Sequence, residues 1–173
     1  MWTLAKEKIL TDATPITFLG IDMSLMKNGD VNLNQRAFAQ QLLDKHGMGD
    51  ANPTKCIQMS SLPTELDLPT PKELKQLQGY SGEFNWLATR TRTDLSYYVS
   101  VLASACTRFA KWSFELAKKI LRYLRATLDV GLVISRTGEE QQLHVWTDAG
   151  YAGSDTRSQS GLVVVWAGSV ISL

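Results

Sequence analysis

The chain has 173 residues, a formal net charge of +1 and 44% hydrophobic residues, which is enough to fill a core and argues against wholesale disorder. No apolar run reaches the roughly 18 residues of a membrane span, and the first residues lack the apolar core of a secretory signal, so we expect an intracellular protein with no membrane partner. Cys56 and Cys106 have no second Cys or His at ligand spacing, which argues against a zinc site and a disulfide framework.

The first predicted elements are a β-hairpin and a helix. Residues 17–23 form an apolar run, and residues 31–33 follow a turn that contains Asn28-Gly29, a pair that accepts the positive φ of tight turns. Asn34 is placed to cap the next helix, and Gly47 is placed to end it.

An extended connection and a strongly marked helix follow. Residues 52–69 contain three prolines and two serines, which predicts a linker without regular structure. Thr70-Pro71-Lys72-Glu73 predicts a helix start, because threonine can cap, proline suits the first turn and the glutamate can reach back to the cap amide. Gly79 and Gly82 lower helix propensity there, which predicts that another backbone approaches this helix closely.

Two further helices and four strands complete the predicted chain. The helices begin at Thr93-Asp94 and run from about 112 to 126, and with the preceding helix they predict a small antiparallel bundle. The last three of the four strands are expected to begin one sheet with a bare face and an exposed edge, which is an association hazard. His144 is expected on the strand surface. The strands are predicted at 131–135, 143–147, 161–166 and 170–173, with turns at Thr137-Gly138 and Ala167-Gly168-Ser169.

Positive charge is concentrated in the predicted helices. Residues 72–129 hold ten Lys or Arg against five acids, although the whole chain is nearly neutral. On the third helix, at 100° per residue, four cations fall in one narrow sector opposite the apolar stripe. Such a stripe can follow a phosphate backbone without reading sequence, and the alternative is an ordinary solvated helix face. The four cations are Lys111, Lys118, Arg122 and Arg125.

Arg90 and Arg92 lie between two predicted helices, where the N-terminus of the second helix adds backbone N–H donors that favour an anion. A phosphate contact is one interpretation. The other is a capping turn in which the arginines pair with Glu83 or Asp94.

Several short motifs occur in the order typical of one family, and the chain resembles copia-type LTR retrotransposon Pol polyproteins over most of its length. The resemblance implies an α+β fold. Residues 1–33 would be the end of the reverse transcriptase palm with a primer-grip-like hairpin, 34–130 a thumb-like antiparallel helical bundle, and 131–173 the first strands of a truncated ribonuclease H-like mixed sheet. The motifs are Phe18-Leu19-Gly20-Ile21, Phe38 to Leu43 with Gly47-Met48, Thr89 to Tyr97, Trp112 and Ala117 to Leu124, and Trp146 to Gly153.

The resemblance assigns roles to two places. Phe18, Leu19, Gly20 and Ile21 would press against the primer end, although apolar residues beside a tight turn are also typical of hairpin core. Asp148 would be the first ribonuclease H carboxylate and a Mg²⁺ ligand, because a hard oxygen donor at a strand end suits that ion. In isolation, an aspartate before Ala-Gly is simply a turn former.

The sequence departs from the family pattern at its catalytic positions. The aspartate pair of the polymerase site is missing, the second acid two residues after Asp148 is Gly150, and a further carboxylate would lie beyond Leu173. A two-metal hydrolytic site needs several carboxylates around ions roughly 4 Å apart. We therefore expect Mg²⁺ to serve the complete parent enzyme and not to bind this chain tightly, and we expect the chain to catalyse neither reaction alone.

The resemblance predicts partners and leaves two alternatives open. The partners would be a template–primer or RNA–DNA hybrid and the missing parts of the Pol polyprotein, in a cytoplasmic particle or the nucleus. The first alternative is a co-opted or degraded element product that acts as a non-catalytic helical binding or scaffold module. The second is a helical protein-interaction domain unrelated to nucleic acid, in which the cationic stripe is ordinary surface. The sequence does not predict an oligomeric state.

Overall fold

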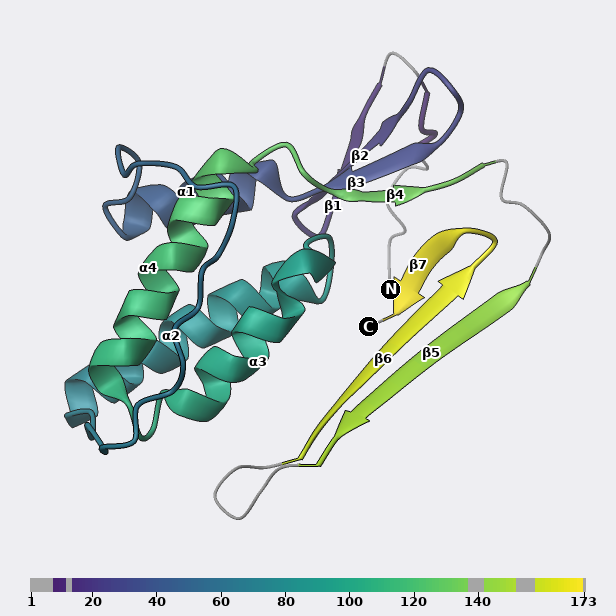
Figure 1. Cartoon of the computed structure of the whole chain (residues 1–173). Helices are drawn as coiled ribbons and strands as arrows, with labels where there is room; N and C mark the ends of the chain where they lie inside the picture. The colour runs from purple at the N-terminus through teal and green to yellow at the C-terminus, as the bar shows by residue number, and fades with distance from the viewer. Residues whose placement is uncertain (1–7, 12–13, 137–141, 152–157, 173) are drawn as a thin grey trace, which may run out of the picture. The chain divides into compact units, whose positions relative to one another are not determined.

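The computed structural model describes residues 8–11, 14–136, 142–151 and 158–172, and there the chain is α+β, with four α-helices and two antiparallel sheets (Figure 1). The chain divides into two compact units. Residues 35–130 form the helical unit, and residues 1–34 together with 131–173 form the β unit. Within the described ranges, no helix is both long enough and apolar enough to cross a membrane.

The first sheet of the β unit joins strands from the two flanking segments. β4 pairs with β3 across the whole helical unit in sequence, and Gly131 permits this approach, because a Cβ at that position would lie 2.3 Å from the carbonyl oxygen of Leu33. The strands are β1 (Ile16–Phe18), β2 (Ile21–Leu25), β3 (Val31–Asn34) and β4 (Leu132–Ile134), in the order β1-β2-β3-β4.

Two tight turns separate the N-terminal strands. The apolar run 17–23 is not one continuous strand, because Leu19 and Gly20, with φ of 50° and 75°, form a turn between β1 and β2. Positive φ at both central residues is typical of the hairpin turn whose twist matches antiparallel strands. The predicted turn at Asn28-Gly29 is confirmed, and the Met26 N–H donates to the carbonyl oxygen of Asp30 across it (2.7 Å).

The helical unit follows the predicted order of helices, with changes at two helix starts. The Thr70–Glu73 capping box is confirmed. The predicted Asn34 cap is wrong: Asn34 is the last residue of β3, and the N-cap is Gln35 without a side-chain cap hydrogen bond. The helix predicted from Thr93 starts with a short 3₁₀ turn, η1. The elements are α1 (Arg36–Lys45), α2 (Pro71–Ala88), η1 (Thr93–Leu95), α3 (Ser96–Ala105) and α4 (Ala110–Ala126).

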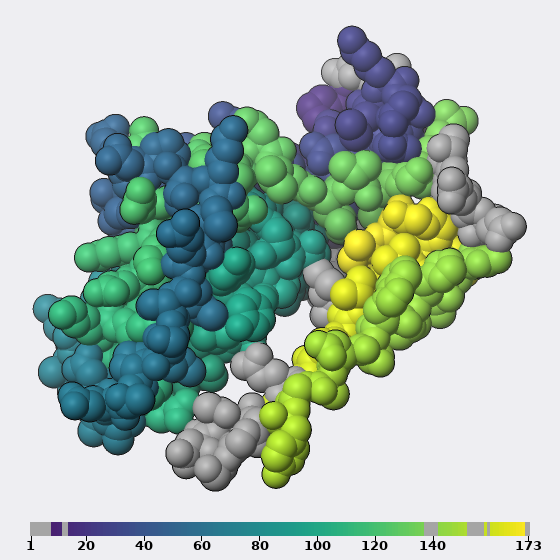
Figure 2. Space-filling view, in the orientation of Figure 1, coloured from purple at the N-terminus to yellow at the C-terminus, as the bar shows by residue number. Residues whose placement is uncertain are grey.

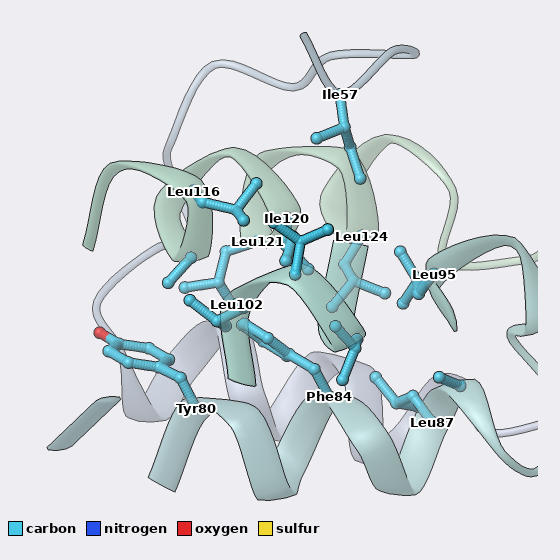
Figure 3. Packing of buried hydrophobic residues seen from close by; sticks show 14 of the residues in the cluster. Ile57, Tyr80, Phe84, Leu87, Leu95, Leu102, Leu116, Ile120, Leu121 and Leu124 are labelled. Atoms are coloured by element: carbon cyan, nitrogen blue, oxygen red, sulfur yellow. The ribbon is translucent and has the colours of Figure 1, made fainter. Parts of the chain in front are cut away.

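A single apolar core holds the helical unit together. α2 packs against α3 and α4, and α1 packs against α4. Figure 3 shows the aromatic rings of α2 and the leucine and isoleucine side chains of α3 and α4 meeting in this core. Burial of these side chains, each contributing roughly 1.5–3 kcal/mol, dominates the stability of the unit. Fully or almost fully buried members are Phe84, Leu87, Leu95, Leu102, Ile120, Leu121 and Leu124.

The connection before α2 is extended, as predicted, but it is not a free linker. Ile57 is buried in the core cluster, and the Trp112 indole N–H donates to the Ser60 hydroxyl (3.0 Å). Figure 2 shows this segment, in dark blue, lying over the helical unit beside the green residues of α4. The connection is therefore part of the folded unit.

The second sheet contains the last three predicted strands, which confirms that they form one sheet. All strand pairings in both sheets are antiparallel, so the predicted mixed sheet is not found among the described strands. The turn at Ala167-Gly168 is confirmed. The turn predicted at Thr137-Gly138 lies outside the described residues. The strands are β5 (Leu143–Gly150), β6 (Gln159–Trp166) and β7 (Ser169–Ser172), in the order β5-β6-β7.

Candidate nucleic-acid interface

The predicted cationic stripe of α4 is divided between two roles. Lys111 and Lys118 are exposed. The Arg122 Nε donates to the carbonyl oxygen of Asn52 (2.7 Å), and the Arg125 guanidinium donates to the carbonyl oxygen of Ala51. The two arginines therefore hold the connection against α4, and only the two lysines present their charge without a contact of this kind.

The two arginines of the turn after α2 also differ. Arg92 is 2% exposed, and its guanidinium donates to both carboxylate oxygens of Asp94 (3.0 and 2.8 Å) and to Thr127. Arg90 is exposed and lies over the Trp86 ring, 4.9 Å from its centroid. The capping-turn interpretation therefore describes Arg92, whereas Arg90 is at the surface.

The Arg92 network shifts two titrations. Burial by itself would raise the pKa of Asp94, but hydrogen bonds from Arg92 and Tyr123 outweigh it and lower that pKa from its usual value. Burial and the hydrogen bond to Asp94 raise the pKa of the Tyr123 hydroxyl. The carboxylate is therefore ionised and bound to Arg92, and its hydrogen bond from Tyr123 joins η1 to α4.

The exposed face of α2 was not predicted as a site. Among the described residues, nothing lies within 4 Å of a Cβ built at Gly79 or Gly82, so the expected close approach of another backbone is not found there. Trp86, 36% exposed, lies one turn after Gly82. Glycines inside a well-capped helix, with a tryptophan at one-turn spacing, were the sequence pattern that could have revealed the face. We call it the α2 face; its exposed residues are Lys75, Gln78, Gly79, Gly82, Asn85, Trp86, Thr89 and Arg90.

The α2 face carries cations and no acid. The two acids of α2 are engaged elsewhere: Glu73 accepts from its cap residue Thr70, and Glu83 accepts from Lys45 and His46 (2.7 Å). Burial by itself would raise the pKa of Glu83, but the hydrogen bonds from Lys45 and His46 outweigh it and lower that pKa. An anion at the α2 face therefore meets no opposing carboxylate of this helix.

The tip of the first hairpin is exposed. Phe18 and Leu19 are 62% and 70% exposed, so these predicted contact residues are not hairpin core. The Thr17 hydroxyl donates to Asp22 across the turn (2.6 Å) and braces it. Gly20 and Ile21 complete the turn and begin β2. An exposed apolar side chain at positive φ is costly, by roughly 1–2 kcal/mol, so this conformation requires support from its surroundings.

Asp148 lies on β5, exposed, opposite Gly161 of β6. Strand alternation places it on the same face as Trp146 and His144, whose rings stack 5.5 Å apart. Among the described residues, no group of three or more His, Cys, Asp or Glu side chains is arranged to hold a metal ion. Asp148 therefore offers one oxygen ligand, and the residues around it do not fit a two-metal site.

The chain is a homologue of copia-type retrotransposon Pol proteins, which confirms the resemblance seen in the motifs. A retrovirus-related Pol polyprotein from transposon RE2 of Arabidopsis thaliana is 33% identical over 153 residues, which cover 85% of this chain and 10% of the polyprotein. An uncharacterized mitochondrial protein of the same plant is 28% identical over 160 residues, 90% of this chain and 64% of that protein. A putative transposon Ty5-1 protein of Saccharomyces cerevisiae is 27% identical over 158 residues, 90% of this chain and 51% of that protein.

These relatives support a general retroelement Pol origin for the chain. The chain spans less than two thirds of the length of each of them. No family model matches the chain, and no solved structure matches it.

Proposed function

We propose that this chain is the palm-end, thumb and early ribonuclease H segment of a retrotransposon reverse transcriptase, and that its helical unit binds a template–primer duplex or RNA–DNA hybrid. The observation that carries the proposal is the α2 face: cations, amides and an exposed tryptophan surround Gly82, and neither carboxylate of α2 belongs to this face. Retroelement Pol origin agrees with such a ligand.

The chemistry of the α2 face suits a nucleic-acid backbone. Gly82 lets a sugar–phosphate chain approach the helix without meeting a side chain. Gln78 and Asn85 can donate and accept hydrogen bonds, Trp86 offers an apolar ring surface, and Arg90 supplies a charge for phosphate. Contacts of this kind position a duplex without reading its sequence, and each neutralised phosphate steepens the salt dependence of binding.

Of the other residues predicted to bind nucleic acid, the proposal keeps two and leaves out three. Lys111 and Lys118 of α4 are exposed and available to phosphate. We leave Arg92, Arg122 and Arg125 out, because one is buried and the other two hold the connection.

The β unit has two proposed roles. Its first hairpin would end the palm, with Phe18 and Leu19 touching the primer. Its second sheet would begin a ribonuclease H domain, with Asp148 as the first of several Mg²⁺-binding carboxylates. Because the described residues supply no complete site, we assign polymerisation and hybrid cleavage to the longer polyprotein and none of their steps to this chain.

A binding assay on the full chain tests the proposal. A fluorescently labelled RNA–DNA hybrid is titrated at several salt concentrations, and the slope of log affinity against log salt is measured. The double substitution Lys75→Glu and Arg90→Glu is expected to weaken binding and to flatten that slope. Lys27→Glu, on the β2–β3 turn, is the control for the single α2-face substitution Arg90→Glu, because each of these two changes alters the charge by the same amount. Equal effects of the control and of the α2-face variant on affinity and slope would refute the proposed interface.

A non-catalytic binding or scaffold module of the same origin is the second candidate. It is favoured by the short mitochondrial relative, of which this chain covers 64%. The genomic sequence on both sides of the reading frame distinguishes the two. An upstream pair of polymerase aspartates and a downstream acidic helix support the enzyme segment, whereas stop codons support the module.

A further inference from the structure

Among the described strands, β5 lies at the edge of its sheet. No described strand pairs with its outer side, and all eight of its residues are exposed, including Trp146 at 55%. Proteins commonly protect such edges with lysine, proline or a bulge. β5 contains none of these residues, and the one irregular register in its sheet lies between β6 and β7.

We propose that β5 pairs in antiparallel fashion with β5 of a second copy of this chain, across a two-fold axis at Trp146. The two three-stranded sheets then form one continuous six-stranded sheet. The proposal concerns this chain by itself and is independent of nucleic-acid binding by the helical unit. In the dimer, Asp148 faces His144 of the second copy, and this contact takes the place of the Mg²⁺ that Asp148 would bind in the longer polyprotein.

Symmetry restricts the possible registers. Two copies of an antiparallel edge are related by a two-fold axis perpendicular to the sheet, so each face of one copy continues as the same face of the other. Because side chains alternate along a strand, an axis at a residue pairs positions equally far before and after it. With the axis at Trp146, His144 of each copy lies opposite Asp148 of the other, and the two indoles lie opposite one another.

The neighbouring registers are less complementary. An axis at Thr147 places each Asp148 opposite an indole and His144 opposite Gly150. An axis at Val145 places His144 opposite the indole and removes the aspartate from the histidine. In the Trp146 register, an imidazole N–H can donate to the carboxylate at two symmetric places, and side-chain pairs of this kind directly across a ladder are favourable.

The other face of the paired strands supports the same register. Leu143 comes opposite Ala149, and Val145 comes opposite Thr147, so apolar or small side chains meet along the seam. Within the sheet, these β5 residues are already joined to Trp166, Val164 and Leu162 of β6, which extends the apolar surface on that face. A hydrogen-bonded pairing of His144 with Asp148 on one face and apolar contacts on the other identify a second copy as the matching occupant.

Site-specific cross-linking tests the register directly. In a full-length chain carrying Cys56→Ser, which removes the exposed cysteine, the substitution Trp146→Cys is expected to give a disulfide-linked dimer under mild oxidation. Directly opposed residues have Cα atoms about 4.5–5.5 Å apart, within disulfide range. Asp148→Cys alone is the matched control, because its two copies would lie roughly 13 Å apart along the strands. Combined with His144→Cys, it is expected to cross-link. Cross-linking of the control as efficiently as Trp146→Cys would overturn the register.

Charge reversal tests the dimer without cysteines. Sedimentation velocity on the full chain is expected to show a monomer–dimer equilibrium, and Asp148→Lys is expected to raise the dissociation constant roughly tenfold, because two pairs are lost. Adding His144→Glu to Asp148→Lys is expected to restore most of the affinity. Unchanged far-UV circular dichroism shows that each variant folds. A chain that is monomeric throughout, or a dimer that neither substitution weakens, would overturn the proposal.

Discussion

Replacing Gly82 by alanine is expected to stabilise the helical unit. Gly82 lies inside α2, and no residue that the structure describes lies within 4 Å of a Cβ built there. The substitution therefore gains helix propensity, about 1 kcal/mol, without creating a clash. For a unit of the size of residues 35–130, this corresponds to a rise in Tm of about 4–8 °C, measured by far-UV circular dichroism. A lower Tm would refute the inference that this face is open within the chain.

The same substitution is expected to weaken hybrid binding, because the added methyl group occupies the space proposed for a sugar–phosphate backbone. A Gly82→Ala variant that is more stable but binds the hybrid more weakly has lost a binding contact and has kept its fold. Gly82→Gln is expected to weaken binding further, and Ser100→Gln, an exposed position on α3, serves as the control for a long polar side chain. Affinity that is the same for Gly82→Gln and Ser100→Gln would refute the α2 face as the interface.

Three further predictions test the fold. Ile57→Ala is expected to lower the free energy of unfolding by about 2–4 kcal/mol in urea titrations, because its side chain is buried in the core, and a cost below 1 kcal/mol would show that the connection is not docked. Leu19→Asn is expected to raise stability by about 1 kcal/mol by relieving positive φ; thermal unfolding at lower temperature would contradict this. Asp94→Asn is expected to cost roughly 2 kcal/mol at neutral pH, less than for a fully buried pair because the Asp94 side chain is 32% exposed. Folding lowers the pKa of Asp94, so its contribution to stability is complete above the pKa of the unfolded chain and is lost as pH falls through the folded pKa. The free energies of unfolding of the wild type and of Asp94→Asn should therefore converge in acid.

Features encoded in adjacent residues were predictable from the sequence. The Thr70–Glu73 capping box depends on four consecutive residues, and it forms as expected. The Asn34 cap failed because pairing with Asp22 extends β3 through Asn34, and that pairing is set by the sheet and not by the local sequence. Likewise, Gly131 directly precedes β4, which pairs with β3, a contact that no local pattern reveals.

The candidate site shows the same division between local and long-range information. Helical periodicity correctly grouped Lys118, Arg122 and Arg125 on one side of α4, but it did not show that the extended connection covers part of that side. Arginine suits this role, because its planar fork donates several hydrogen bonds at fixed angles, whereas lysine carries a compact charge that is readily left in water. On α2, the sequence showed that Gly79 and Gly82 lower helix propensity. In the structure, the two glycines leave part of the helix surface without side chains. A cationic pattern in a sequence therefore indicates a nucleic-acid interface only after the main-chain carbonyls that compete for its arginines have been located.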